Sequence, residues 1–482
     1  MVLILYNTIN EIVNSQGIKN LYLGENIMAF NKDFMWGVAS ASYQVEGAYN
    51  KDGKGLNVWD YYCQGNPAIA HKENGNIACD HYHRYKEDVA NMKKLGVKYY
   101  RFSISWTRII PNGIGEVNPK GIEFYNNLID ELLANDIQPL VTMFHWDYPI
   151  ALEKQGAWLN HNSSDWFEEY AKVLVENFSD RVKYWITFNE PQVFIGNGYH
   201  IGNFAPFRKC STKDLAEMSH NVLLAHGKAV KVIRKFAKQD VKIGYAPIGP
   251  VYNPTSNTEK NIQLAREKSF DLTKDNFIFS LSWWSDPVYL GKYPDRAYEV
   301  LGDNMPTIKD GDMELISQPL DFYGVNIYQA QALIDDDGTI HGYFRDDSNY
   351  ATGQPVTQLG WPINDDCLYW SCKFLTERYN LPILITENGT SCNDKICLDG
   401  KVHDPNRIDF LARYLKGIKK AIDDGIDIIG YMYWSVMDNF EWASGYDARF
   451  GLIYVDYQTQ ERTIKDSGYW YKSVIETNGE NI

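Results

Sequence analysis

Two glutamates stand where apolar, β-type runs of the sequence give way to loops. Glu190 lies in the string TFNEP (187–191), and Glu387 lies in the string ITENG (385–389). Cleavage of a glycosidic bond uses two carboxyl groups, one that protonates the leaving oxygen and one that attacks the sugar or activates water. The two strings together therefore predict chemistry on a sugar, and the surrounding elements have to bring the two carboxyl groups together.

Eight short apolar runs, separated by longer segments with helical periodicity, predict strands that alternate with helices. Amphipathic spacing at 121–134 and 166–178 predicts two of the helices. This alternation indicates an α/β protein with a single closed (β/α)8 TIM barrel and elaborated loops at the C-terminal strand ends. The predicted strands are 34–39, 97–103, 137–145, 182–189, 241–246, 322–327, 382–386 and 428–434.

Polar and aromatic residues recur where these runs end. In a (β/α)8 barrel the catalytic groups gather at the C-terminal ends of the strands. Two segments, 247–320 and 328–381, are too long for simple loops, so we expect helices and cleft walls there. The candidate site residues at the strand ends are Arg101, His145, Asn189, Glu190, Asn326, Glu387 and Trp434.

Composition limits the partners and the compartment. The net charge of −15 argues against nucleic acid and anionic membranes, so the expected partner is a neutral small molecule. No run of 18 apolar residues predicts a membrane span. Seven cysteines, an odd number, suit the reducing cytosol, so we expect a cytoplasmic protein. We expect residues 1–28 to form a disordered N-terminal extension before a catalytic domain at 29–482.

Two groups of residues have a weak likeness to metal sites. The spacing of Cys367 to Cys372 and of Cys392 to Cys397 misses the usual zinc pattern. His81 and His83 lie at a polar helix start and not in a ligand pattern. We expect neither a metal nor a disulfide at these positions, and no cofactor, because sugar hydrolysis needs only carboxyl groups and a proton.

The chain resembles glycoside hydrolase family 1, the β-glucosidase family, from about residue 30 to residue 475. Six motifs occur in the order of the family. They are FMWGVASASYQVEG (34–47), RFSISW (101–106), HWD (145–147), TFNEP (187–191), ITENG (385–389) and the pair WSVMDNFEW (434–442) and RFG (449–451).

The resemblance implies a retaining β-glucosidase that forms a covalent glycosyl-enzyme intermediate. It makes Glu387 the nucleophile, kept ionised by Arg101 and the Tyr328 hydroxyl. It makes Glu190 the acid/base, with a pKa raised by burial and by the charge of Glu387. Retention of configuration predicts carboxyl groups about 5–5.5 Å apart.

The same resemblance implies the substrate contacts. Asn189 would bind the sugar 2-hydroxyl, and Trp434 would form the floor beneath the ring. Trp361 resembles the tryptophan of the leaving-group site. The other implied substrate-binding residues are Gln44 and Glu441 at the 4-hydroxyl, Glu441 at the 6-hydroxyl, His145 and Trp442 at the 3-hydroxyl, and Asn326, Tyr328 and Phe450.

The implied substrates are cellobiose, cello-oligosaccharides and aryl β-glucosides, and the expected role includes cellulose degradation. Broad β-galactosidase or β-fucosidase activity stays an alternative, as does a 6-phospho-β-glucosidase, although the Glu441 carboxylate would repel a phosphate. The acid/base Glu190 argues against a thioglucosidase. A remote alternative is a non-catalytic relative that binds sugar or protein. The sequence leaves a monomer and a homo-oligomer equally open.

Overall fold

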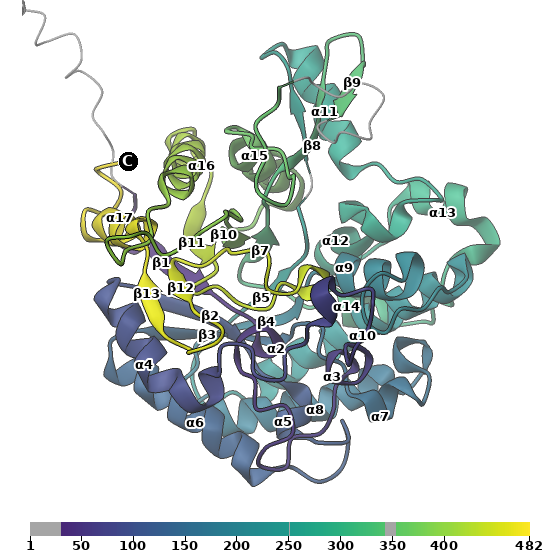
Figure 1. Cartoon of the computed structure of the whole chain (residues 1–482). Helices are drawn as coiled ribbons and strands as arrows, with labels where there is room; N and C mark the ends of the chain where they lie inside the picture. The colour runs from purple at the N-terminus through teal and green to yellow at the C-terminus, as the bar shows by residue number, and fades with distance from the viewer. Residues whose placement is uncertain (1–29, 250, 343–352) are drawn as a thin grey trace, which may run out of the picture.

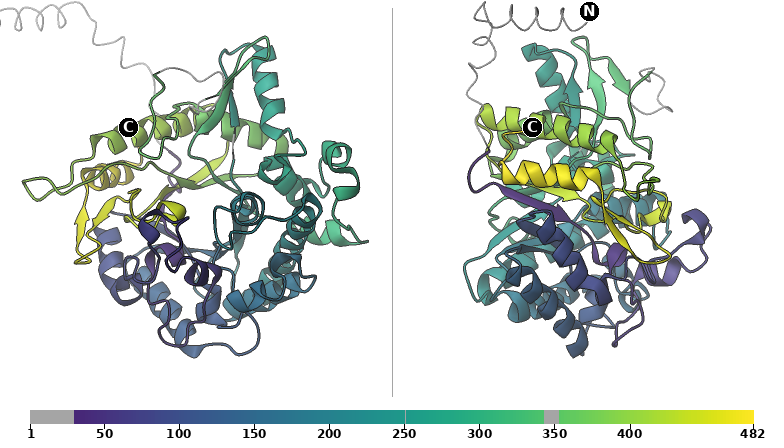
Figure 2. Two further views of the ribbon diagram at one scale, coloured as in Figure 1. Left: turned by 45° about the vertical axis from the view of Figure 1, so that its right-hand side comes forward. Right: turned by 60° about the vertical axis from the view of Figure 1, so that its left-hand side comes forward.

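The computed structural model describes residues 30–249, 251–342 and 353–482. Eight parallel strands form one sheet that curls into a nearly closed barrel, with helices around it (Figures 1 and 2). The predicted barrel is confirmed, and the strand ends differ from the predicted ones by at most two residues. The strands are β1 (Met35–Ala39), β2 (Tyr99–Ser103), β3 (Gln138–Phe144), β4 (Tyr184–Asn189), β5 (Lys242–Ala246), β7 (Tyr323–Asn326), β10 (Ile383–Asn388) and β11 (Ile428–Trp434).

The barrel closes between β5 and β7, the two ends of the strand order β5-β4-β3-β2-β1-β11-β10-β7. The Asp321 backbone N–H donates to the Ile243 carbonyl at 2.9 Å. The Ile243 N–H in turn donates to the Asp321 carboxylate at 2.8 Å. Further along, the Asn326 N–H donates to the Pro247 carbonyl at 3.1 Å. A side chain therefore takes the place of a backbone group in this seam.

The helices that surround the barrel follow the strands along the chain. The two helices predicted at 121–134 and 166–178 are α6 and α8, each beginning two or three residues earlier than predicted. The longer helices are α4 (His81–Lys94), α6 (Pro119–Ala134), α8 (Ser163–Phe178), α10 (Thr212–Phe236), α11 (Glu259–Phe270), α12 (Leu281–Leu290), α15 (Cys367–Tyr379), α16 (Pro405–Asp423) and α17 (Asp466–Glu476).

Helix α6 illustrates why these segments are helical. The Asn118 side chain accepts from the Lys120 backbone N–H and caps the helix, and Pro119 occupies the first helical position. Phe124, Leu128 and Leu132 recur at helical spacing and are buried, so one face packs on the barrel.

Alternating residues of the strands build a separate core inside the barrel. Met35, Leu140, Ile186, Leu384 and Met432 belong to one apolar cluster, whereas their strand neighbours pack against the helices. A Cβ atom at residue 37 of β1 would lie 2.2 Å from a Met432 sulfur, so this position takes glycine. Bulky methionines thus fill the interior beside a residue without a side chain.

The two long segments contain helices, as predicted, and also a small sheet that the sequence did not predict. Strands β6 (Val251–Pro254), β8 (Ala330–Ile334) and β9 (Ile340–Gly342) form this sheet, which stands out from the barrel beside α11 (Figure 1). The shorter helices here are α13 (Asp295–Leu301) and α14 (Asp312–Ile316). Elsewhere lie α2 (Ser42–Val45), α3 (Val58–Tyr62), α5 (Trp106–Ile109), α7 (Ile150–Glu153), α9 (Pro191–Ile195) and the hairpin β12 (Ile453–Val455) and β13 (Arg462–Ile464).

A buried ion network joins the C-terminal elements to the loop after β11. The Lys465 ammonium donates to Asp394 at 2.5 Å and to Asp438 at 2.6 Å, and its side chain is fully buried. Arg407 of α16 also binds Asp394, at 2.7 Å, and Arg449 binds Asp438 at 2.6 Å. The two aspartates are thereby shared between cations from separate segments.

The N-terminal extension predicted at 1–28 lies outside the described residues. Among the residues that are described, no helix is long and apolar enough to cross a membrane.

Candidate active site

A cavity of about 370 Å³ lies at the C-terminal ends of the barrel strands. It includes Glu190 and Glu387, which follow or end β4 and β10. Its volume falls within the range of small-molecule sites. Seven other predicted residues line the same cavity, namely His145, Tyr328, Trp361, Trp434, Glu441, Trp442 and Phe450.

The remaining predicted residues lie directly behind this lining. Arg101, Asn189 and Asn326 are buried and hydrogen-bonded to the two glutamates or to each other. Gln44 is buried and donates to Glu441 at 3.2 Å. The structure therefore brings together all thirteen predicted site residues.

Glu387 is held by two donors. Arg101 Nη1 donates to its Oε1 at 2.5 Å, and the Tyr328 hydroxyl donates to its Oε2 at 2.7 Å. Burial raises the pKa of Glu387, whereas Arg101 and Tyr328 favour the ionised form and offset part of this effect. The prediction that both residues stabilise the charge agrees with these contacts, and the burial adds an opposing cause that the sequence did not reveal.

Glu190 has one donor, Asn326 Nδ2, at 2.8 Å from its Oε1. Burial, and next the negative charge of Glu387, raise the pKa of Glu190 well above its ordinary value. The two carboxyl groups thus have different surroundings, and those of Glu387 favour the charged form more strongly. The backbone of Glu190 is left-handed, with φ 44° and ψ 66°, immediately before α9.

Asn189 connects three of the surrounding groups. Its Oδ1 accepts from Arg101 Nη2 at 2.6 Å and from Asn326 Nδ2 at 2.9 Å. Its Nδ2 lies 3.1 Å from Nε2 of His145. Burial, with Arg101 nearby, lowers the pKa of His145 well below its ordinary value, so this imidazole is neutral. One continuous set of hydrogen bonds therefore orients Glu190, Glu387 and His145.

Glu441, with Gln44 directly behind it, forms a polar end of the cavity. Gln44 Nε2 also donates to the Phe440 carbonyl at 2.9 Å, which fixes the amide. Its Oε1 is buried without a partner among the described residues. Burial, and next the charge of Glu387, raise the pKa of Glu441 to about 8. Polar atoms left available at this depth suit a ligand that carries hydroxyl groups.

Aromatic rings cover the other walls. Trp434 stacks on His145 with ring centroids 5.7 Å apart. Trp361 contacts the rings of Tyr328 at 5.4 Å and Phe450 at 5.8 Å. Flat apolar faces beside a few fixed polar groups are typical of sites that bind rings.

Sequence reasoning missed part of the lining. Most of these residues come from loops, α9 and short helical turns, where no strand end or periodic pattern marks them. Three had a signal in the sequence: Trp146 lies in the HWD motif, Ile327 ends a predicted strand, and Gln192 lies two residues after Glu190. The missed lining residues are Trp146, Gln192, Val193, Asn197, Phe204, Ile248, Gly249, Phe279, Ile327 and Gln329.

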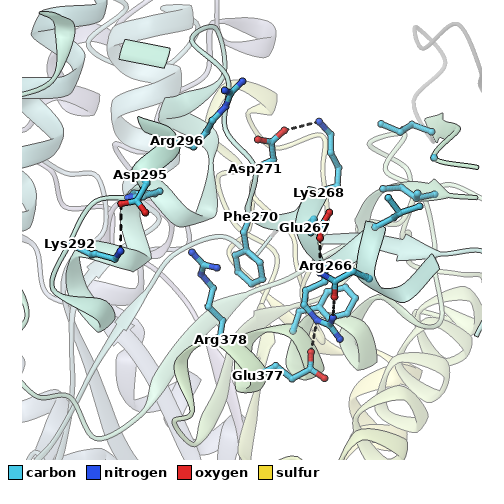
Figure 3. Close-up of a pocket in the computed structure, with 17 residues that line it drawn as sticks. Arg266, Glu267, Lys268, Phe270, Asp271, Lys292, Asp295, Arg296, Glu377 and Arg378 are labelled. Carbon is cyan, nitrogen blue, oxygen red and sulfur yellow. Dashed lines mark hydrogen bonds and ion pairs between the residues drawn. The ribbon is translucent and has the colours of Figure 1, made fainter. Parts of the chain in front are cut away.

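A second, more open hollow lies between α11, α13 and α15 (Figure 3). Its cations are paired with carboxylates. Arg266 binds Glu377 at 2.8 Å, and Lys268 binds Asp271 at 3.0 Å. Lys292 similarly lies 3.5 Å from Asp295. These charges balance one another at the surface, in contrast to the buried carboxyl groups of the first cavity.

The histidines and cysteines with a weak likeness to metal sites make other contacts or are unpaired. His81 contacts the buried Asp88 at 2.8 Å, while His83 contacts Asp80 at 2.6 Å on the surface. Within residues 30–249, 251–342 and 353–482, no three His, Cys, Asp or Glu side chains are grouped to hold a metal. The seven cysteines are unpaired.

Comparisons with known proteins identify the family. A family model described as "Glycosyl hydrolase family 1" matches residues 27–480. The chain belongs to this family. It is a retaining glycoside hydrolase, so the resemblance inferred from the motifs is confirmed.

The chain matches its relatives over almost the whole length of both proteins. The chain is 44% identical to "1,4-beta-D-glucan glucohydrolase" of Thermotoga neapolitana, over 93% of this chain and 99% of that protein. It is 39% identical to an aryl-phospho-beta-D-glucosidase of Bacillus subtilis, over 94% and 98%. A solved β-glucosidase from Thermotoga maritima, in complex with a substituted glucoimidazole, has a TM-score of 0.85 at 43% identity, covering 94% and 99%.

Proposed function

We propose that this family 1 enzyme removes terminal non-reducing β-D-glucosyl residues from cellobiose, cello-oligosaccharides and aryl β-glucosides. The observation that carries the proposal is the buried pair Glu190 and Glu387, whose differing contacts favour a proton on the first and a charge on the second. The relatives named for β-glucosides and β-glucans support the substrate class.

In the proposed reaction, the Glu387 carboxylate attacks the anomeric carbon. Glu190 gives its proton to the departing glycosidic oxygen as that bond breaks. A covalent glycosyl-enzyme forms, and the charge of Glu387 that raised the pKa of Glu190 is gone. Glu190 then takes a proton from water, which attacks the anomeric carbon and releases the sugar with its configuration retained. The predicted separation of about 5–5.5 Å between the carboxyl groups belongs to this proposal.

The glucosyl ring is proposed to bind at the end of the cavity formed by Gln44 and Glu441. The free Gln44 Oε1 and the Glu441 carboxyl group would take the 4-hydroxyl, and Glu441 also the 6-hydroxyl. His145 and Trp442 would hold the 3-hydroxyl, Asn189 the 2-hydroxyl, and Trp434 the face of the ring. The leaving group would then lie against the ring cluster of Trp361, Tyr328 and Phe450, with Asn326 behind the scissile bond.

The proposed substrate carries no phosphate. Glu441 is buried and lies beside Gln44, and a phosphate dianion at the 6-position would meet this carboxyl group. Among the described residues, no lysine or arginine lines the cavity to neutralise the phosphate. The phospho-glucosidase alternative keeps one supporting observation, the relative from Bacillus subtilis. Comparable kcat/KM for 4-nitrophenyl β-glucoside and its 6-phosphate would overturn the preference.

One panel of substrates tests the whole proposal. Wild-type enzyme should hydrolyse 4-nitrophenyl β-glucoside and cellobiose, and ignore the α-glucoside. The β-galactoside and β-fucoside measure how broad the activity is, because one hydroxyl separates them from glucose. Glu387→Gln should be inactive while its circular dichroism and melting temperature stay close to wild type. Hydrolysis by Glu387→Gln at the wild-type rate would refute the assigned nucleophile.

We also propose a cytoplasmic location and a role late in cellulose degradation, acting on short soluble products. Unpaired cysteines, four of them fully buried, suit a reducing compartment. Cell fractionation with an antibody would test the location, and its recovery outside the cytoplasm would contradict it. Size-exclusion chromatography would decide between a monomer and a homo-oligomer.

A further inference from the structure

Gln192 makes a pair of contacts at the wall of the active-site cavity. Its side chain is fully buried in α9, two residues after Glu190. Its Nε2 donates to the Ile248 carbonyl at 3.0 Å. Its Oε1 accepts from the Ile248 backbone N–H at 3.2 Å. One carboxamide thus satisfies both backbone groups of a single residue in another loop, as a neighbouring strand would.

We call the two hydrogen bonds between the Gln192 side chain and the Ile248 backbone the Gln192 clamp. The segment at 247–249, which contains Ile248, contacts β7 on its other side. Ile248 pairs with Asn326 in a parallel bridge, and the Gly249 N–H donates to the Asn326 carbonyl at 2.9 Å. A Cβ atom at residue 249 would lie 2.6 Å from Val325, so the segment is tightly packed there. Residues 247–249 are therefore fixed between the Gln192 side chain and the end of β7.

Asn326 connects the segment at 247–249 to Glu190, because it contacts both. Its Nδ2 is the donor to Glu190 Oε1 at 2.8 Å. The Glu190 backbone N–H donates to the Ala246 carbonyl at 2.8 Å, at the start of the clamped segment. The contacts form a closed circuit from Glu190 through Gln192, Ile248 and Asn326 and back to Glu190.

We propose that Gln192 is a positioning residue for the acid/base, which sets the orientation of the Glu190 carboxyl group through Ile248 and Asn326. The inference rests on the proposed role of Glu190. Gln192 also fixes Ile248 and Gly249, which form one wall of the cavity.

The test compares three β-glucosides whose leaving groups differ in their need for a proton. The 2,4-dinitrophenolate of a dinitrophenyl glucoside departs unprotonated, whereas the 4-nitrophenolate and the sugar of cellobiose depend increasingly on the acid. Gln192→Met keeps the length of the side chain and removes both hydrogen bonds. The control is Gln318→Met, because Gln318 is half-buried outside the lining of the active-site cavity and donates within its own segment, to the Glu314 carbonyl.

Gln192→Met should lower kcat/KM for cellobiose by at least about tenfold more than for the dinitrophenyl glucoside, since general acid catalysis contributes roughly 10²–10⁴-fold. Gln318→Met should leave both values unchanged. An equal loss for all substrates, or no loss, would overturn the proposal, because a general packing role does not depend on the leaving group.

A second variant covers the case in which Gln192→Met does not fold. Gln192→Glu keeps the size of the side chain, and its neutral acid form offers one donor and one acceptor, as the amide does. Its cellobiose activity relative to wild type should therefore recover as the pH falls, and a constant ratio across pH would contradict the clamp. Failure of wild-type enzyme on every glucoside would instead refute the proposed function, so the two failures are distinguishable.

Discussion

At the scale of residues, the site is built from two identical side chains with unequal neighbours. Glu387 faces a guanidinium and a phenol, and Glu190 faces one amide and the charge of Glu387. The hydrogen-bonded set around Asn189 keeps these surroundings different. The order in which the two groups lose their protons is therefore a property of the neighbours, and it can be changed by replacing them.

The pH dependence of kcat/KM should be bell-shaped. The value should rise with pH as Glu387 loses its proton and fall at higher pH as Glu190 loses its own, because Glu190 has the more strongly raised pKa. Glu190→Gln should remove the falling limb and lower kcat/KM for cellobiose by about 10²–10⁴-fold. A falling limb that persists in Glu190→Gln would assign it to another group.

Replacing Arg101 by lysine should move the rising limb to higher pH. Lysine keeps a positive charge but lacks the planar guanidinium, whose two terminal nitrogens donate to Glu387 and Asn189. The charged form of Glu387 therefore loses stabilisation. We expect kcat/KM to fall by roughly 10²–10³-fold, the loss typical of removing one preorganised donor. Arg413→Lys, at an exposed ion pair, is the control and should behave as wild type. An unchanged acidic limb would show that Arg101 does not govern the ionisation of Glu387.

At the scale of elements, the strands and the site residues at their ends were predictable, because burial on both faces gives short apolar runs whose ends are visible in the sequence. The helix starts were less predictable, since α8 begins with a polar turn. The Gln192 clamp was beyond prediction, because its partner Ile248 is 56 residues away and only the fold brings them together. The burial that raises the pKa of Glu387 likewise depends on packing from several elements.

The ion network around Lys465 makes a prediction at this scale. Lys465→Met leaves Asp394 and Asp438 with one cation each in a buried place. Breaking such a pair should lower the free energy of unfolding by about 3–5 kcal/mol, which thermal and urea unfolding would measure. Lys472→Met, in the partly exposed pair with Glu476 on α17, should change it by less than about 1 kcal/mol. Equal effects of the two substitutions would contradict a structural role for the network.

At the scale of the whole molecule, the barrel has one seam with few backbone bonds, between β5 and β7. Asp321 closes it by accepting from Ile243 and from Arg234, the latter at 2.6 Å. Partial burial raises the pKa of Asp321, but the bonds from Arg234 and Ile243 outweigh it and lower the pKa below the ordinary 3.8. The closure of the barrel is thus linked to the charge of one side chain.

Asp321→Asn should therefore be less stable than wild type at pH 7. A group whose pKa is lowered by folding stabilises the protein above its unfolded pKa, and this stabilisation is lost as the pH falls through the folded value. The difference between the two proteins should shrink below pH 3.8 and then vanish. Urea unfolding across this range measures it. A difference that is independent of pH would mean that the charge of Asp321 does not contribute.

The left-handed backbone at Glu190 lowers the stability of the fold at a position whose side chain is proposed to serve the reaction. Glycine adopts this conformation freely, whereas a residue with a Cβ atom is strained there by about 1 kcal/mol or more. Glu190→Gly should consequently be more stable than Glu190→Ala, and equal stability of the two would contradict the strain. Selection for durability alone would favour glycine at this position, and only selection for catalysis retains the glutamate. A descendant of this chain that lost its activity would be expected to accept glycine at this position without loss of stability.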